Sequence, residues 1–211
     1  MTLREAWISR VTPEDYEAHM ARIGQAEANA LLVRDLLSRT PIATGSRVLV
    51  AGAGTGQMFD HIPPETFAPY HLVCSDISST LLERLSLRVV CESDLDDVEE
   101  TKLEPGFGAI LLVLVLEHVD FRKALASLTS LRPGSFLIVI QENPPSMSEA
   151  MTPGRTPPGS MRVFAEEARP HLVPFADLAG EMASHGYILE HRQDAPVADG
   201  KKMIGTIFRL G

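Results

Sequence analysis

The sequence predicts an α/β protein built as a three-layer, doubly wound (Rossmann-like) sheet, and two observations lead to this fold class. Short β-branched runs recur along the chain and are apolar at successive positions, which is typical of strands buried on both faces of a parallel sheet. Helical patterns lie between several of these runs, and such alternation places helices on both faces of the sheet. The predicted strands are 47–51, 71–75, 87–91, 109–116, 136–140, 187–193 and 203–210.

The chain opens with two predicted helices. Thr12 can cap a helix that has Pro13 at its first position, and Gly24 separates this helix from a second one over 25–39. Further helices are expected over 79–85, 121–131 and 174–185. We expect a single domain with an N-terminal helical lid over 1–40 and a core over 41–211. A Pro-rich loop at 141–160 interrupts the core, and we expect it to become ordered when ligands bind.

Composition excludes several classes of function. Lys and Arg number 19 against 28 Asp and Glu, so the net charge is −9, which argues against nucleic acid or an anionic membrane as partner. The longest apolar run, 109–116, is too short to span a bilayer, and no secretory signal is visible. A cytoplasmic location is therefore expected. Cys74 and Cys91 lack zinc or disulfide spacing, and the His residues show no ligand spacing, so no metal is predicted.

The sharpest feature is a glycine-rich stretch after the first strand. Residues 48–56 read Val-Leu-Val-Ala-Gly-Ala-Gly-Thr-Gly, and a helix is expected to begin at Gln57. Glycines permit a tight turn and close ligand approach, and a helix N-terminus offers free N–H groups, so a carboxylate or phosphate is expected here. Asp76 ends the next strand, where an acid can accept hydrogen bonds from two ribose hydroxyls. Alternatively, Asp76 caps the helix that follows.

These motifs together resemble the class I S-adenosylmethionine-dependent methyltransferases, in particular the small bacterial methyltransferase-11/12-like proteins. The dinucleotide fingerprint Gly-x-Gly-x-x-Gly is not met, because Gln57 stands at its last position. The resemblance extends over about residues 45–140 and implies seven strands, the last of them antiparallel. It is carried by 48–56, Asp76, Ser93-Asp94-Leu95, Leu116-Glu117-His118-Val119 and Leu131-Arg132-Pro133-Gly134.

The resemblance also implies that S-adenosyl-L-methionine lies across the strand ends, with S-adenosyl-L-homocysteine as the product. The methionine part would lie against the glycine loop, the ribose on Asp76 and the adenine beside Asp94. The family usually has an acid where this chain has Val50, which leaves open how the methionine ammonium is held. The expected cofactor-binding residues are Gly52, Ala53, Gly54, Thr55, Gly56, Asp76, Ile77, Asp94, Leu95 and Leu112.

We expect the methyl acceptor to be a small molecule. Methyl transfer from a sulfonium mainly needs alignment and the exclusion of water, and a base is needed only when the acceptor is protonated. His118 and Glu117 at the end of the fourth strand are candidate bases, and packing roles are the alternative. The candidate acceptor-binding residues are Tyr16, His19, Glu142 and Asn143. Two rival functions stay open: an NAD(P)-dependent oxidoreductase and a non-catalytic methyltransferase-like binding module.

Overall fold

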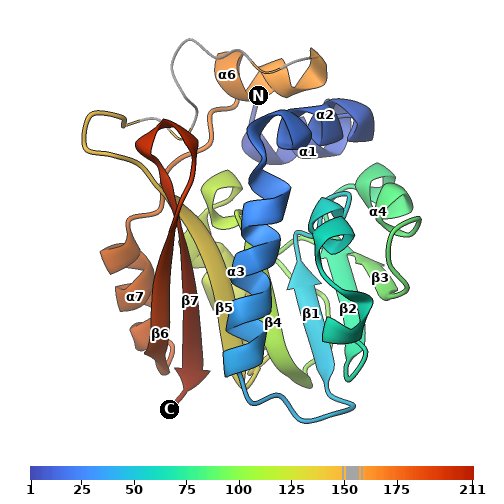
Figure 1. Ribbon diagram of the computed structural model, residues 1–211, viewed down its shortest axis with the longest axis vertical. Coiled ribbons are helices and arrows are strands. Elements are labelled where there is room, and N and C mark those ends of the chain that lie inside the picture. The colour runs from blue at the N-terminus through green and yellow to red at the C-terminus, as the bar shows by residue number, and fades with distance from the viewer. Residues whose placement is uncertain (149, 151–156, 158) are drawn as a thin grey trace.

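The structure is a computed structural model that describes residues 1–148, 150, 157 and 159–211 (Figure 1). Its centre is a seven-stranded sheet with strand order β3-β2-β1-β4-β5-β7-β6. The strands β1 to β5 pair in parallel, and β7 runs antiparallel to both β5 and β6. The predicted fold class, including the antiparallel last strand, is thereby confirmed. The strands are β1 Arg47–Ala51, β2 His71–Asp76, β3 Glu92–Leu95, β4 Phe107–Val113, β5 Ser135–Glu142, β6 Tyr187–Pro196 and β7 Lys202–Leu210.

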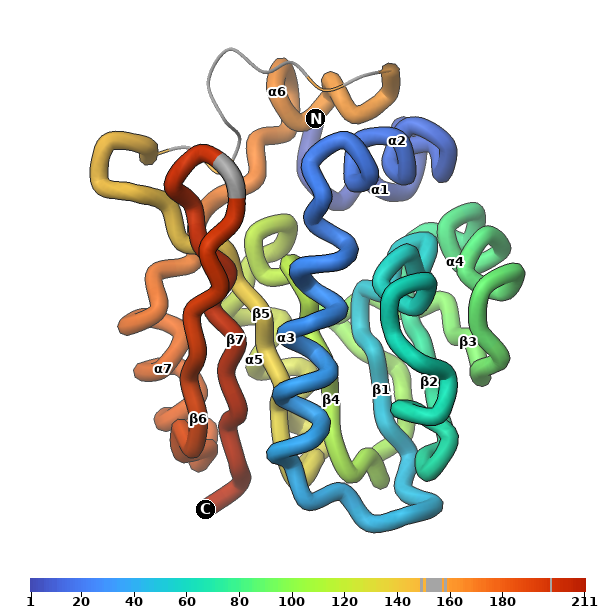
Figure 2. Tube along the Cα trace, in the orientation of Figure 1, coloured from blue at the N-terminus to red at the C-terminus, as the bar shows by residue number. Residues whose placement is uncertain are grey.

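Helices cover both faces of the sheet, because the central strands have apolar side chains on both of their faces. In β1, Val48 and Val50 face one layer, while Leu49 and Ala51 face the other. The first layer contains α3 Gln25–Arg39, which crosses in front of the sheet in Figure 1, and the short 3-10 helix η1 Gln57–His61. The second layer contains α5 Phe121–Thr129 and α7 Phe175–Ser184, and Figure 2 shows α5 behind the sheet. The remaining helices outside the cap are α4 Ser79–Leu85, η2 Pro64–Thr66, η3 Leu116–His118 and η5 Ala198–Gly200.

A separate group of helices lies over the carboxyl ends of the parallel strands. It consists of α1 Leu3–Ser9, α2 Pro13–Ile23, η4 Gly159–Arg162 and α6 Val163–Glu166, and we call these four elements the cap. The cap has its own small core, formed by Ala6, Val11, Met161, Val163, Phe164 and Ala168. Within the predicted lid over 1–40, α1 and α2 thus join the cap, whereas α3 packs on the sheet.

The structure corrects three of the predicted elements. The third strand is Glu92–Leu95 and not 87–91, because the apolar run before it lies on the surface, with Val90 99% exposed. The fourth strand ends at Val113, because Leu114 has a φ of 57° and turns the chain out of the sheet. The helix expected at Gln57 is a 3-10 helix of five residues, which is too short to supply a strong helix dipole. Among the described helices, none is both long and apolar enough to cross a membrane.

Candidate functional site

The glycine loop after β1 brings bare backbone to the edge of the sheet beneath the cap. Gly52, Gly54 and Gly56 all have left-handed φ angles, of 67°, 57° and 71°. A Cβ atom on Gly52 would lie 2.6 Å from Cγ2 of Val115, and one on Gly54 would lie 3.2 Å from the Tyr16 ring. Glycine is therefore required at positions 52 and 54 for two reasons, namely the left-handed backbone angle and the lack of space for a side chain.

Asp76 ties the glycine loop to the end of β2. Its Oδ2 accepts the backbone N–H of Gly54 at 2.8 Å, and its Oδ1 accepts that of Ser78 at 3.0 Å. The side chain is almost fully buried, and this burial raises the pKa of the carboxyl, while the two N–H donors act in the opposite direction. Ser78 is the N-cap residue of α4, so Asp76 also supports the start of that helix.

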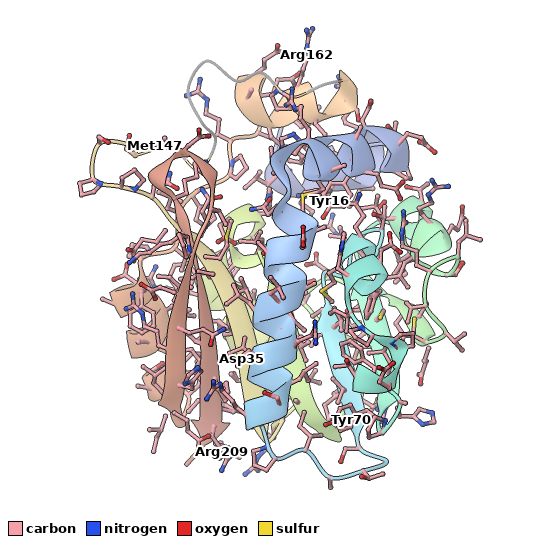
Figure 3. The ribbon with its side chains drawn as sticks, in the orientation of Figure 1. Tyr16, Asp35, Tyr70, Met147, Arg162 and Arg209 are labelled. Carbon is pink, nitrogen blue, oxygen red and sulfur yellow. The ribbon has the colours of Figure 1, made fainter. Side chains whose placement is uncertain are left out.

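A cavity of about 600 Å³ lies between the glycine loop and the cap. This volume is within the range of small-molecule sites. The cap supplies Trp7, Tyr16 and Phe164 to its wall, and their rings pack edge-on or tilted with centroids 4.8–5.5 Å apart in the pairs that Trp7 makes. Tyr16, which Figure 3 labels where α2 meets the core, reaches down to the glycine loop. The cap thus contributes a wall of aromatic rings to the cavity.

The cavity brings together many of the residues that the sequence singled out. Those that line it are Tyr16, His19, Gly52, Ala53, Gly54, Asp76, Ile77, Glu117 and His118. The other predicted site residues do not line it within the described part of the chain: they are Thr55, Gly56, Asp94, Leu95, Leu112, Glu142 and Asn143. The part of the predicted 141–160 loop at 149, 151–156 and 158 lies outside the described residues.

The residues that miss the cavity do so for local reasons. Leu112 is buried in the core on the α5 side of the sheet, and Leu95 is 67% exposed. Glu142 forms an ion pair with Lys202 at 2.7 Å, and Asn143 accepts a hydrogen bond from the side chain of Gln141 at 2.8 Å. These contacts hold both side chains at the end of β5 and in the loop that follows it.

A short acidic segment that the sequence analysis left aside reaches the cavity instead of Asp94 and Leu95. Because β3 lies further along the chain than expected, its end places Asp96, Asp97 and Val98 at the cavity wall. The carboxylate of Asp96 accepts the Thr101 hydroxyl at 2.7 Å and the Lys102 N–H at 2.8 Å, which fixes this turn. The acidic run itself was visible in the sequence, but only the correct strand end could have distinguished its members.

Glu117 and His118 lie side by side in η3 and differ strongly in protonation. Oε1 of Glu117 accepts the Gln141 N–H at 2.7 Å, and Oε2 has no partner among the described residues. Burial raises the pKa of Glu117 to about 7 and lowers the pKa of His118 to about 4. At neutral pH the carboxyl is therefore the better proton acceptor of the two, which reverses the order expected from the side-chain types alone.

Comparison with known proteins finds one family model that matches the central part of the chain. Residues 49–139 match the model of a family described as a methyltransferase domain. The matched stretch begins in β1, ends in β5 and contains the glycine loop, Asp76 and Glu117. The central part of the chain therefore resembles a methyltransferase domain. No curated protein matches this chain in sequence.

Several solved structures share the fold of this chain at low sequence identity. A putative methyltransferase in complex with a methyltransferase activator from Haloferax volcanii has a TM-score of 0.66 at 12% identity, covering 93% of this chain and 96% of that one. Magnesium protoporphyrin IX methyltransferase from Synechocystis, with bound SAM, has a TM-score of 0.59 at 16% identity, with 86% and 76% covered. 1,6-Didemethyltoxoflavin-N1-methyltransferase from Burkholderia thailandensis has a TM-score of 0.58 at 17% identity, covering 88% of this chain and 77% of that one.

An ion-pair network connects the cap to the core of the protein. Glu17 of α2 accepts from Arg84 at 3.0 Å and from Arg88 at 2.7 Å. Arg88 also pairs with Asp60 at 3.0 Å and donates to the carbonyl oxygen of Thr55 in the glycine loop. Hydrogen bonds from the two guanidinium groups lower the pKa of Glu17 to about 2. We call Glu17, Arg84, Arg88 and Asp60 the latch, because these residues connect α2, α4 and the glycine loop.

Within the cap, η4 is joined to the start of α2 by hydrogen bonds between backbone N–H groups and side chains. The N–H of Ser160 donates to Asp15 Oδ2 at 2.7 Å, and the Ser160 hydroxyl accepts the N–H of Thr12 at 3.0 Å. The cap therefore behaves as one unit, although its helices come from two distant parts of the chain. Within the described residues, no three His, Cys, Asp or Glu side chains gather in a way that could hold a metal ion.

Proposed function

We propose that this protein transfers a methyl group from S-adenosyl-L-methionine to a small-molecule acceptor enclosed under the cap. The observation that carries the proposal is the cavity itself, which has the glycine loop and Asp76 on one side and an aromatic roof on the other. Its volume of about 600 Å³ is within the range of small-molecule sites. Two of the solved neighbours, named as methyltransferases of magnesium protoporphyrin IX and of 1,6-didemethyltoxoflavin, point toward the same class of acceptor.

The residues present fit the cofactor. The bare backbone at Gly52 and Gly54 leaves the close approach that the methionine part needs, and the buried carboxylate of Asp76 faces the same cavity. Asp96 and Asp97 lie where β3 ends and replace Asp94 as candidates for the adenine side. When bound, S-adenosylmethionine supplies a methyl group that is already activated on a sulfonium sulfur.

The role of the protein is then alignment, exclusion of water and, for a protonated acceptor, removal of a proton. The cap rings Trp7, Tyr16 and Phe164 line the cavity and reduce its contact with water. We assign the proton-accepting role to Glu117, whose Oε2 is unpaired in the described structure and whose pKa is about 7. The bound cofactor would supply the methyl group, with its sulfur as the leaving group, and Glu117 would accept the proton that the acceptor loses. The ring of His118 packs edge-on against Trp7 and Phe164, so we assign His118 a role in supporting the aromatic wall of the cap.

Calorimetric titration tests the cofactor assignment. We expect S-adenosylhomocysteine to bind and NAD and NADP not to bind, and binding of a nicotinamide cofactor alone would overturn the proposal.

Asp76→Ala should raise the dissociation constant for S-adenosylhomocysteine about tenfold or more, because it removes charge-assisted hydrogen bonds. Asp94→Ala should change it by less than about tenfold, because Asp94 does not line the cavity. Methyl transfer from labelled S-adenosylmethionine to a panel of small acceptors then separates an enzyme from a non-catalytic binding module.

A further inference from the structure

Two buried amide oxygens on the cavity wall have no hydrogen-bond partner in the described structure. They are Oδ1 of Asn29, a residue that is 4% exposed in α3, and Oε1 of Gln57, the first residue of η1. Both residues line the cavity. An unsatisfied buried acceptor costs about 1–3 kcal/mol, and one that persists in a native fold needs an explanation such as a ligand.

The orientation of Gln57 is fixed by its other end. The Nε2 amide group donates to the carbonyl oxygen of Glu17 at 3.1 Å, so Oε1 is the end left for another donor. Glu17 is itself held by the latch arginines, which keeps this carbonyl in place. The cavity therefore has a pre-positioned acceptor directly after the glycine loop.

Asn29 and Gln57 lie on elements that pack together. α3 packs against η1, and Asn29 continues the buried face of α3 that includes Ala26, Ala30 and Val33. The lining of the cavity also includes two apolar side chains of the core, Val50 from β1 and Met58 from η1. A donor bound at this place would find neutral carbonyl oxygens and no carboxylate from β1.

We infer that the amide oxygens of Asn29 and Gln57 bind a primary ammonium group, namely that of the methionine part of the cofactor. The inference rests on the proposed function. An ammonium group carries three donors and no acceptor, and so it matches a pair of unpaired oxygens. Hydrogen bonds from a charged donor are stronger than neutral ones, so two amide oxygens are sufficient without a buried carboxylate. This assignment also accounts for an apolar residue at position 50.

Two ligands that differ in the amino-acid part provide the test. S-Adenosylhomocysteine carries the ammonium group, whereas 5′-methylthioadenosine keeps the adenosine and the sulfur but lacks the amino-acid part. We expect Asn29→Leu to raise the dissociation constant for S-adenosylhomocysteine about tenfold or more and that for 5′-methylthioadenosine less than about twofold. Asn29→Asp, which keeps an acceptor, should retain binding of S-adenosylhomocysteine. Gln57→Met should show the same selective loss as Asn29→Leu.

Ser75→Ala is the matched control. The Ser75 hydroxyl is equally buried and equally unpaired in the described structure, but Ser75 does not line the cavity, so both affinities should be unchanged. An equal loss of affinity for both ligands in the Asn29→Leu protein would mean that Asn29 only supports the fold. No loss of affinity for either ligand would mean that Asn29 does not contact the ammonium group. Either result overturns this inference and leaves the proposed function standing. If the parent protein bound neither ligand, the proposed function would fail with it.

Discussion

Glu117 illustrates how a single buried acid links stability to pH in this protein. Its pKa is raised to about 7 in the folded chain, against an ordinary value of 4.5. Between these two pH values the folded protein binds a proton that the unfolded chain has released. The stability that depends on Glu117 is therefore fully present below about pH 4.5 and falls as the pH rises to about 7, by roughly 3 kcal/mol.

Glu117→Gln should remove this part of the pH dependence. The amide oxygen can still accept the Gln141 N–H, and no buried charge is formed at high pH. We expect the variant to be more stable than the parent at pH 8 by about 2–3 kcal/mol and similar to it at pH 5. Urea unfolding at the two pH values measures the difference. Parallel curves for the two proteins would show that Glu117 is already solvated in the folded state.

Gly54→Val should separate ligand binding from folding. A β-branched residue at a φ of 57° is strained by about 1–2 kcal/mol, and its side chain would meet the Tyr16 ring and the space over the loop. We expect a lower melting temperature and no rise on addition of S-adenosylhomocysteine. Gly45→Val is the control, because Gly45 has a φ of 82° with open space around it, and this variant should keep the full ligand-induced rise. A retained rise in the Gly54→Val protein would contradict the placement of the cofactor.

Among the helices and strands, those with explicit end signals were predictable from the sequence. The Thr12 hydroxyl accepts the Asp15 N–H at the start of α2, and Gly24 has a φ of 64° where α2 gives way to α3. The central strands were predictable because burial on both faces leaves them uniformly apolar. The edge strand β3 was not, because it pairs with β2 alone and three of its four residues are polar or charged.

The site was predictable to the same degree as the elements that carry it. Gly52, Gly54 and Asp76 could be singled out from the sequence because the predicted ends of β1 and β2 agree with the structure, and all three residues line the cavity. Asp96 and Asn29 were missed for different reasons. Asp96 depended on the end of β3, and the role of Asn29 depends on the packing of α3 against η1, which no local pattern encodes.

The latch should determine how firmly the cap is held. Glu17→Gln removes the charge that two arginines share, and it leaves Arg88, 17% exposed at its side chain, with one carboxylate partner fewer. We expect the free energy of unfolding to fall by about 1–3 kcal/mol and amide hydrogen exchange in α1 and α2 to become faster than in β1. Because the pKa of Glu17 is lowered to about 2, the latch contributes fully above about pH 4.5 and is lost as the pH falls through about 2.

Asp35→Asn provides the comparison for the latch. Asp35, labelled in Figure 3, pairs with Arg39 one turn further along α3, outside the cap. Such a surface pair contributes only about 0.3–0.5 kcal/mol, so hydrogen exchange in α1 and α2 should be unaffected. If the two variants had equal effects on the cap, the latch would be no more than another surface ion pair.

The strand order of the whole molecule explains where the cavity lies. The order runs 3-2-1 in one direction from β1 and 4-5 in the other, and such a reversal opens a crevice outside the carboxyl ends of the strands. The glycine loop lies on the β1 side of this crevice, and Glu117 follows β4 on the other side. The cap covers the crevice from above, so the cavity lies between the small core of the cap and the core of the sheet.

The molecule as a whole should be stabilised by its ligand. With S-adenosylhomocysteine at about one hundred times its dissociation constant, a ligand that binds only the folded state adds about 2.7 kcal/mol. For a domain of this size that corresponds to a rise in melting temperature of roughly 5–10 °C. NAD at the same concentration should produce no rise. Differential scanning fluorimetry measures both, and an equal rise with NAD would favour the oxidoreductase alternative.

The two-part origin of the cap has a consequence for how this protein can diversify. Trp7 from the N-terminal segment packs on Phe164 from the segment after β5, with ring centroids 4.8 Å apart, and the cap core contains side chains from both segments. A chimera that received only a foreign N-terminus would therefore leave Phe164 facing a mismatched surface. Changes of acceptor should be inherited as paired exchanges of residues 1–24 and 159–168, while the sheet and the glycine loop beneath them stay constant.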